Sequence, residues 1–333
     1  MLKMFLEEKI KCKILILFLF VLTGCSVDIS ESLFIASIGF EEIDGELNGY
    51  FYLPLSNDVG KSESEGKGTG EYVRVKGESV EKVFNNVKAV NSIDINLKHV
   101  SSVVLNVGLL KHEFLEEFIS YVKYSNLLDY NFYFLATKEK MDDIFSFQNP
   151  NQESVLNSLL VISGDNEGIR LVADPVHYLD FSKKYYDKRS ILIPLLDIEE
   201  LWNINGENVK NFYPQSAVYF YKGNVELVEK EKGSPYFRSS ITFYDEIKNE
   251  PIYFNEYKMA HKKDVMEISL KYINFSDQDI PVESVKGLVY ERIQEYLEKY
   301  KHCDPLDLYF WSEKFNINLN YKDLKIKINV IVN

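Results

Sequence analysis

The chain has 333 residues, of which 46% are hydrophobic and 14% aromatic, so it holds enough apolar material for one large core or several smaller ones and is not disordered as a whole. Its formal net charge of −13 argues against nucleic acid as a partner, because phosphate binding needs a clustered cationic surface. The same charge would repel anionic lipid headgroups, so attachment to a membrane would have to come from something other than surface charge.

The first 25 residues have the pattern of a bacterial signal peptide. Lysines in the first 13 residues are followed by nine unbroken apolar residues at 14–22. Nine residues rise only about 14 Å as a helix, less than half of the roughly 30 Å hydrocarbon core of a bilayer. This segment is therefore predicted to be the apolar core of a signal peptide and not a spanning helix.

The processing site follows at once. Leu22-Thr23-Gly24-Cys25 resembles the lipobox, at which the lipoprotein signal peptidase cuts before the cysteine. The thiol of a new N-terminal cysteine takes a diacylglyceryl group through a thioether, and two acyl chains hold a protein at a bilayer where one does so only marginally. We predict a signal peptide at 1–24, cleavage between Gly24 and Cys25, and fatty acylation of Cys25. The alternative is an inert, buried cysteine after an ordinary hydrophobic segment.

The other two cysteines fit this interpretation. Cys12 would leave with the signal peptide, and Cys303 would be the only cysteine left in the folded body. No intramolecular disulfide can then form. An exported protein of this size can fold without one because its core is large enough.

The first half of the mature chain alternates strands and helices. Strands are predicted at 33–40, 48–55, 71–75, 100–107 and 131–137, and helices at 80–90, 111–124 and 138–145. Strands separated by helices of this length are typical of parallel crossover units. We predict an N-terminal α/β domain over 25–205 with a partly parallel sheet, leaving open whether it is itself divided. The glycine-rich stretch at 60–70 lacks the pattern of a phosphate cradle and is predicted to be a hairpin loop.

The second half has more strands and one long helix. Strands are predicted at 217–221, 225–228, 241–244, 252–257, 266–272 and 324–332, and a helix from Pro281 to about Lys301. A run of strands with one helix predicts an antiparallel sheet covered on one side. We therefore predict a C-terminal α+β domain over 206–333, with the seam between the halves somewhere in 180–213.

The residues do not assemble a recognisable catalytic or metal-binding motif. His112 and Glu116 are four apart on a predicted helix, but they lie beside other charged residues, which favours a solvated face. Asp174, His177 and Asp180 have ligand-like spacing, but Pro175 breaks the helix that would align them. His99, His261 and His302 have no partner at ligand spacing. We predict no enzyme activity, no metal and no cofactor, and we assign most of the aromatic residues to core packing, with an aromatic binding surface as the alternative.

The order of these features resembles the Ger(x)C lipoproteins, the C subunits of nutrient germinant receptors in endospore-forming bacteria. The resemblance begins at the lipobox and spans nearly the whole mature chain. It continues through Phe34-Ile35-Ala36-Ser37-Ile38-Gly39-Phe40, Asp44-Gly45, the segments 98–108, 134–138, 192–196 and 217–223, the long helix, Asp304-Pro305-Leu306, Trp311 and the alternating last strand. Two positions depart from the family pattern. Ser26-Val27-Asp28 stands where a Trp and charged residues usually follow the cysteine, and Asp307 stands where a glycine is expected.

The resemblance implies a non-catalytic, multi-domain ectodomain with a lipid anchor on the outer face of the spore inner membrane. Its implied partners are the two integral membrane subunits, A and B, of the germinant receptor. Cys25 is the only functional residue that it carries over. A second hypothesis is an extracytoplasmic lipoprotein that binds a small solute, which would need a deep interdomain cleft. A third is an extracellular hydrolase, which would need a carboxylate or Ser/His pair in a cleft.

Overall fold

The structure is a computed structural model, and it describes most of the folded body. The described residues are 32–54, 71–90, 94–146, 173–204, 207–212, 216–228, 242–245, 250–262, 265–273, 281–315 and 321–332. The predicted signal peptide, Cys25 and the glycine-rich stretch at 60–70 lie outside them. In the described part of the chain, no helix is long and apolar enough to cross a membrane.

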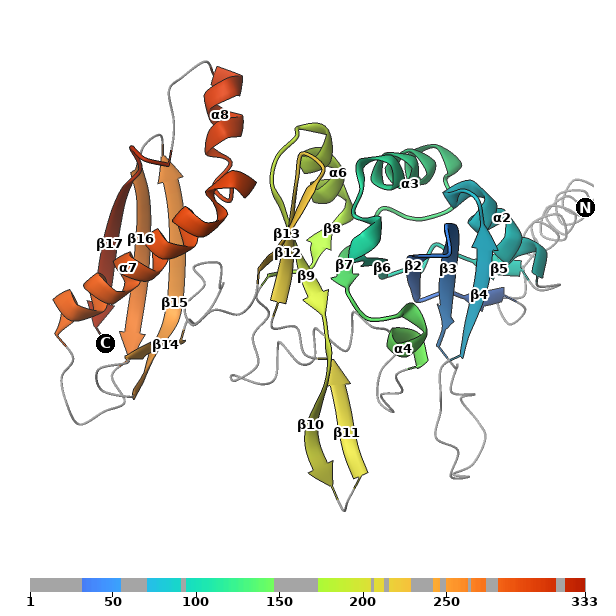
Figure 1. Ribbon diagram of the computed structural model, residues 1–333, viewed down its shortest axis with the longest axis horizontal. Coiled ribbons are helices and arrows are strands. Elements are labelled where there is room, and N and C mark those ends of the chain that lie inside the picture. Colours follow the sequence, from blue (N-terminus) through green and yellow to red (C-terminus); the bar gives the residue numbers. More distant parts are fainter. Residues whose placement is uncertain are drawn as a thin grey trace, which may run out of the picture.

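One nine-stranded mixed sheet organises residues 37–228 (Figure 1). Its strands are β2 (Ser37–Ile43), β3 (Glu46–Leu53), β4 (Glu71–Gly77), β6 (Ser102–Asn106), β7 (Tyr133–Thr137), β8 (Val176–His177), β9 (Ile191–Leu196), β12 (Ser216–Tyr221) and β13 (Asn224–Val228). The hydrogen-bonded order is β13-β12-β9-β7-β6-β2-β3-β4, with β8 paired to β7. The central strands β2, β6, β7 and β9 pair in parallel, which confirms the predicted partly parallel sheet. The strands toward the two edges are antiparallel.

Helices cover both faces of this sheet, as an α/β layer requires. On one face lie α2 (Val80–Val90), α3 (His112–Ser125) and α6 (Tyr178–Tyr186), and on the other lies α4 (Met141–Ser146). A short 3-10 turn, η2 (Val107–Leu109), leads into α3. Helices α2, α3 and α4 fall within or close to the predicted ranges, whereas α6 was not predicted.

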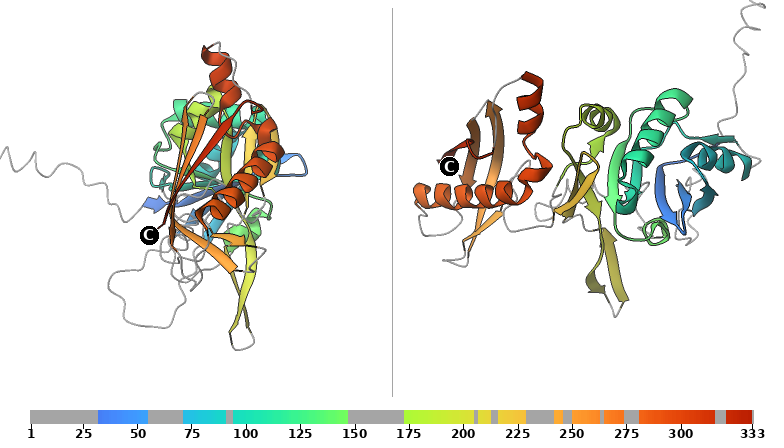
Figure 2. Two further views of the ribbon diagram at one scale, coloured as in Figure 1. Left: turned by 90° about the vertical axis from the view of Figure 1, so that its left-hand side faces the viewer. Right: turned by 45° about the horizontal axis from the view of Figure 1, so that its top comes forward.

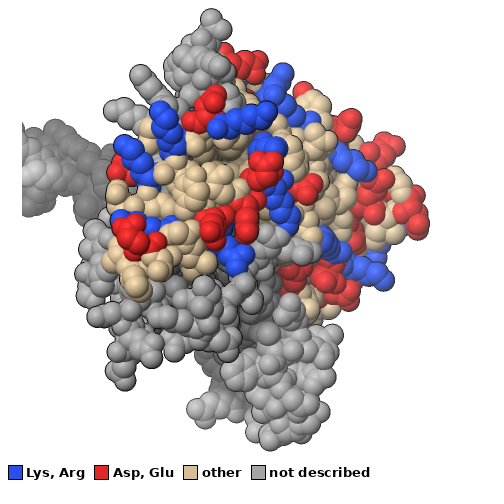
Figure 3. Space-filling view, turned by 60° about the vertical axis from the view of Figure 1, so that its left-hand side comes forward, with Lys and Arg blue, Asp and Glu red and all other residues tan. Residues whose placement is uncertain are grey.

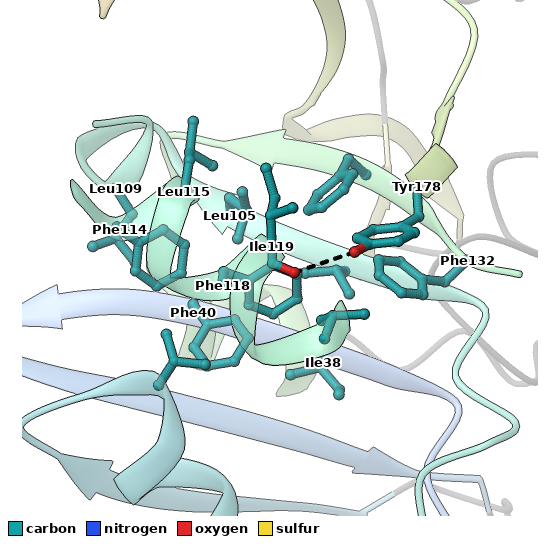
Figure 4. Packing of buried hydrophobic residues seen from close by; sticks show 14 of the residues in the cluster. Ile38, Phe40, Leu105, Leu109, Phe114, Leu115, Phe118, Ile119, Phe132 and Tyr178 are labelled. Atoms are coloured by element: carbon teal, nitrogen blue, oxygen red, sulfur yellow. Dashed lines mark hydrogen bonds between the residues drawn. The ribbon is translucent and has the colours of Figure 1, made fainter. Parts of the chain in front are cut away.

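Aromatic side chains fill the core under α3 (Figure 4). Phe118 of α3 is fully buried, and its ring centroid lies 5.6 Å from that of Phe40, 5.8 Å from that of Phe134 and 6.4 Å from that of Phe132. Nearby, the hydroxyl group of Tyr178 donates to the carbonyl oxygen of Ile119 over 3.3 Å. Edge-on aromatic contacts of this kind add roughly 0.5–1.5 kcal/mol each beyond the burial of area. The aromatic residues of this half are therefore largely structural.

Two small two-stranded sheets accompany the large one. Strand β1 (Ser32–Phe34) pairs in parallel with β5 (Asp94–Asn96), and β10 (Ile198–Ile204) forms an antiparallel hairpin with β11 (Glu207–Phe212). The predicted strand at 33–40 is thus two strands, β1 and β2. The β10–β11 hairpin extends away from the large sheet in all three ribbon views (Figures 1 and 2).

The C-terminal part is a four-stranded sheet crossed by one long helix (Figures 1 and 2). Its strands are β14 (Thr242–Asp245), β15 (Glu250–Lys262), β16 (Val265–Ile273) and β17 (Lys325–Val332), and the helices are α7 (Val282–Tyr300), η3 (Lys301–Cys303) and α8 (Leu308–Phe315). The first three strands are antiparallel, as predicted. Strand β17 is parallel to β16, because the helical segment between them carries the chain back to the starting end of the sheet.

Strand β12 joins the two parts, because it is buried on both faces. Val218 and Phe220 face the core under α6, while Ala217 and Tyr219 pack with the buried residues of α7. The hairpin β12–β13 therefore belongs to the large sheet by hydrogen bonding and to the C-terminal core by packing. The proposed domain boundary at 205/206 stays a prediction, and the strand pairing of β12 with β9 runs across it.

Two glycines give opposite predictions for the same substitution. A Cβ at Gly39 would overlap the Phe145 ring and lie 2.8 Å from the Met141 sulfur, so Gly39→Ala should force α4 outward and destabilise the protein by about 1–3 kcal/mol. A Cβ at Gly287, in α7, would meet nothing within 4 Å, so Gly287→Ala should stabilise it by up to about 1 kcal/mol. Urea unfolding of both variants is the measurement, and equal shifts of the midpoint would contradict this packing.

Candidate functional site

The histidines that carried the metal hypotheses are dispersed and locally satisfied. His112 Nε2 lies 3.5 Å from Glu116 Oε2, and both side chains are mostly exposed, so this pair is the solvated face that the sequence favoured. His177 caps α6, where its Nδ1 accepts from the Leu179 amide. Among the described residues, no group of three or more His, Cys, Asp or Glu side chains is arranged to hold a metal ion.

A buried polar network beneath α4 was not predicted. The Tyr50 hydroxyl group donates to Glu41, and the backbone amide of Met141 donates to the other oxygen of that carboxylate over 3.2 Å. The Tyr72 hydroxyl group donates to Asp142 over 2.8 Å. Burial, followed by the neighbouring Glu41 carboxylate, raises the pKa of Tyr50. Both oxygens of Glu41 are occupied, and the network ties α4 to the sheet.

A second cluster links the N-terminal sheet to the C-terminal part. Arg189, just after α6, forms an ion pair with Asp307, just before α8, and its guanidinium lies 5.1 Å from the centroid of the Phe310 ring. Both charged side chains are less than one-fifth exposed. On the other side of β12, the hydroxyl groups of Tyr219 and Tyr296 are 2.6 Å apart. The two parts of the chain are therefore held together by polar contacts as well as by apolar packing.

The backbone beside this ion pair is unusual. Asp307 has φ 54°, in the left-handed region that favours glycine, which explains why a glycine fits this position. In this chain the strained aspartate forms an ion pair with Arg189, which a glycine could not do. Asp304 fixes the same segment, because its buried carboxylate accepts from the backbone amides of Tyr309 and Phe310. Burial raises the pKa of Asp304, and these hydrogen bonds oppose the rise.

The ion pair can be tested by substitution. Asp307→Asn keeps a residue that tolerates the left-handed region but removes the charge, and it should destabilise the protein by about 1–3 kcal/mol. Asp307→Gly should cost less, because it relieves the backbone strain. Urea unfolding measures both, and Arg189→Met should add little to Asp307→Asn in the double variant. Additive effects of the two single substitutions would contradict direct coupling.

A cleft of about 510 Å³ opens beside this contact. Helix α3 contributes His112 and Glu116, the end of α6 contributes Tyr185 and Tyr186, and the β12–β13 hairpin contributes Lys222. Glu313 of α8 closes the cleft from the C-terminal part. The volume lies within the range of about 300–1,000 Å³ that is usual for small-molecule sites. A smaller hollow of about 220 Å³ shares four lining residues with it.

The walls of the cleft combine aromatic and charged side chains. Tyr185 and Phe220 are buried, and their rings stack at 6.1 Å between centroids. The Tyr185 hydroxyl group also contacts Nδ1 of His112, and burial raises the pKa of Tyr185 to about 12. Sequence reasoning missed this cleft, because its residues come from four separate elements and share no local spacing.

Charge is mixed on the face that carries the C-terminal part (Figure 3). Acidic and basic side chains of the described residues intermingle there, with uncharged surface between them. The described residues of this face thus form no basic stripe for a phosphate backbone, in line with the net charge.

Together, the fold and the cleft define a mixed α/β protein built in two packed parts, with a small-molecule-sized cleft beside their contact. Comparison with known families identifies it further. A family model described as the spore germination protein N-terminal domain matches residues 26–198, just over half of the chain. The chain therefore belongs to this family of spore germination proteins, the Ger(x)C family, which comprises the C subunits of germinant receptors.

Two other comparisons complete the findings. A crystal structure of the GerBC protein aligns with 89% of this chain and 96% of its own, at 14% sequence identity and a TM-score of 0.41. The search of curated proteins gave no match. Family membership associates the chain with spore germination, with germinant receptor complexes and with the spore membrane.

Proposed function

We propose that this protein is the lipid-anchored C subunit of a nutrient germinant receptor and is needed for spore germination. The observation that carries the proposal is the match to the spore germination family over 26–198. The lipobox ending at Cys25 stands directly before that match and supports cleavage after Gly24 and an anchor on the outer face of the spore inner membrane. Its work is docking to the integral membrane A and B subunits, without catalysis and without a cofactor.

Co-purification tests this function. The full chain, tagged at its C-terminus, is extracted from spore membranes with a mild detergent and recovered with its bound proteins. We expect two multi-span membrane proteins to accompany it, and we expect a deletion strain to germinate slowly or not at all in response to a nutrient. A chain recovered without integral membrane proteins, together with normal germination of the deletion strain, would reject the proposal.

A second candidate function is the binding of a small solute, and the cleft beside α6 favours it. The cleft is large enough for a small molecule, is lined by both parts of the chain, and presents several polar groups toward one space. This function is compatible with a place in a receptor complex.

A further inference from the structure

Two aromatic rings line the cleft, and both are largely buried. Phe220 of β12 and Tyr185 of α6 are 4% and 8% exposed, and their ring planes lie only 18° apart. Rings that are stacked on each other and buried to this degree leave only a small apolar patch on the wall of the cleft, among its charged and polar groups.

Lys188 stands on the rim in a backbone conformation that lysine rarely adopts. Helix α6 ends in a Schellman motif, in which the Lys188 amide donates to the carbonyl of Tyr185 and the Arg189 amide donates to that of Lys184. This motif places Lys188 in the left-handed region, at φ 53°, where glycine is the usual residue. A lysine here weakens the helix end and places a cation at the cleft.

Lys222 repeats this feature from a different element. The turn between β12 and β13 has two residues, Lys222 at φ 48° and Gly223 at φ 84°, which is the pattern of a type I′ turn. The first position of such a turn favours Asn, Asp or Gly. Two lysines thus occupy strained positions on separate elements, and both line the same cleft. Strain that recurs around one space is typical of a functional site.

Glu313 indicates which chemistry these lysines suit. It lines the same cleft from α8, and its charge helps to raise the pKa of Lys222, after the larger effect of the hydrogen bond to the Tyr221 hydroxyl group. A carboxylate of the chain itself thus lies within electrostatic reach of this rim. An external anion would compete with Glu313 for Lys222. The remaining rim carboxylate, Glu116, faces His112 on α3.

We propose that Lys188 and Lys222 form the charged rim of a binding site for a small organic anion, whose apolar part contacts the small patch left open at Tyr185 and Phe220. The inference deepens the second proposed function and rests on it, and it does not depend on the receptor partners. The shared chemistry is a carboxylate or phosphate on an aromatic-sized body.

Isothermal titration of the full chain with benzoate tests the proposal, with phenyl phosphate, benzyl alcohol and benzylammonium as comparison probes. We expect one saturable benzoate site whose affinity falls at least about fivefold in Lys188→Gly and in Lys222→Asn. Both variants place the preferred residue in the strained position, so their melting temperatures should rise while binding weakens. Glu313→Gln should bind benzoate more tightly, and Lys183→Gln, on the exposed side of α6, should bind as the wild type does.

Four other outcomes would overturn the inference, and one would refine it. If benzyl alcohol binds as tightly as benzoate, solute binding stands but the role of the lysines falls. If benzylammonium binds more tightly than benzoate, the cleft prefers a cation and not an anion. Unchanged affinity in both lysine variants would mean that the ligand binds elsewhere. No saturable binding of any probe would mean that the cleft is not a binding site for small anions. Stronger binding of phenyl phosphate than of benzoate would support the site and identify phosphate as its preferred group.

Discussion

Cys25→Ala is expected to release the protein from the spore membrane, with nearly complete loss from the membrane fraction after an alkaline wash. The proposed anchor is a diacylglyceryl group on the thiol, and alanine offers no sulfur to accept it. Each buried methylene of an acyl chain contributes about 0.8 kcal/mol, so the chains outweigh any attraction of an acidic surface for the bilayer. Fractionation followed by mass spectrometry of the N-terminal peptide measures both location and modification.

Cys303→Ala provides the matched control. This cysteine is 3% exposed in the C-terminal core, and burial raises the pKa of its thiol to about 12, so it stays protonated and unreactive. The variant should remain in the membrane fraction with the same N-terminal modification as the wild type. An unmodified Cys25 still joined to Gly24 in the native protein would contradict the anchor.

The elements of the fold were largely predictable, because each has a periodicity that its own residues carry. Helix α2 begins and ends at the predicted residues, and α7 fills the predicted range, with Val285, Val289 and Ile293 buried at a spacing of four residues. The predicted strands at 217–221 and 225–228 are β12 and β13, which pair as a hairpin. Such features depend on local sequence, so each can be predicted from its own segment.

The relations between distant elements were not predictable in this way. Strand β12 was predicted to belong to the C-terminal domain, but its hydrogen bonds to β9 place it in the large sheet. Arg189 and Asp307 are 118 residues apart, and no spacing rule connects them. The absence of glycine at position 307 was visible in the sequence, but its meaning depends on the left-handed backbone and on the partner across the contact. The cleft depends on such long-range contacts throughout.

Phe118→Ala is expected to cost about 3–5 kcal/mol of stability, the largest loss among the substitutions considered, because truncation of a fully buried phenylalanine removes apolar contacts and leaves a cavity. The rings around it belong to β2, α3 and β7, so the cavity cannot close without moving a central strand or the helix. Urea unfolding followed by circular dichroism measures the loss. Tyr124→Ala, on the same helix but 77% exposed, should change stability by no more than about 0.5 kcal/mol. A loss below about 1 kcal/mol for Phe118→Ala would mean that α3 does not pack on the sheet as described.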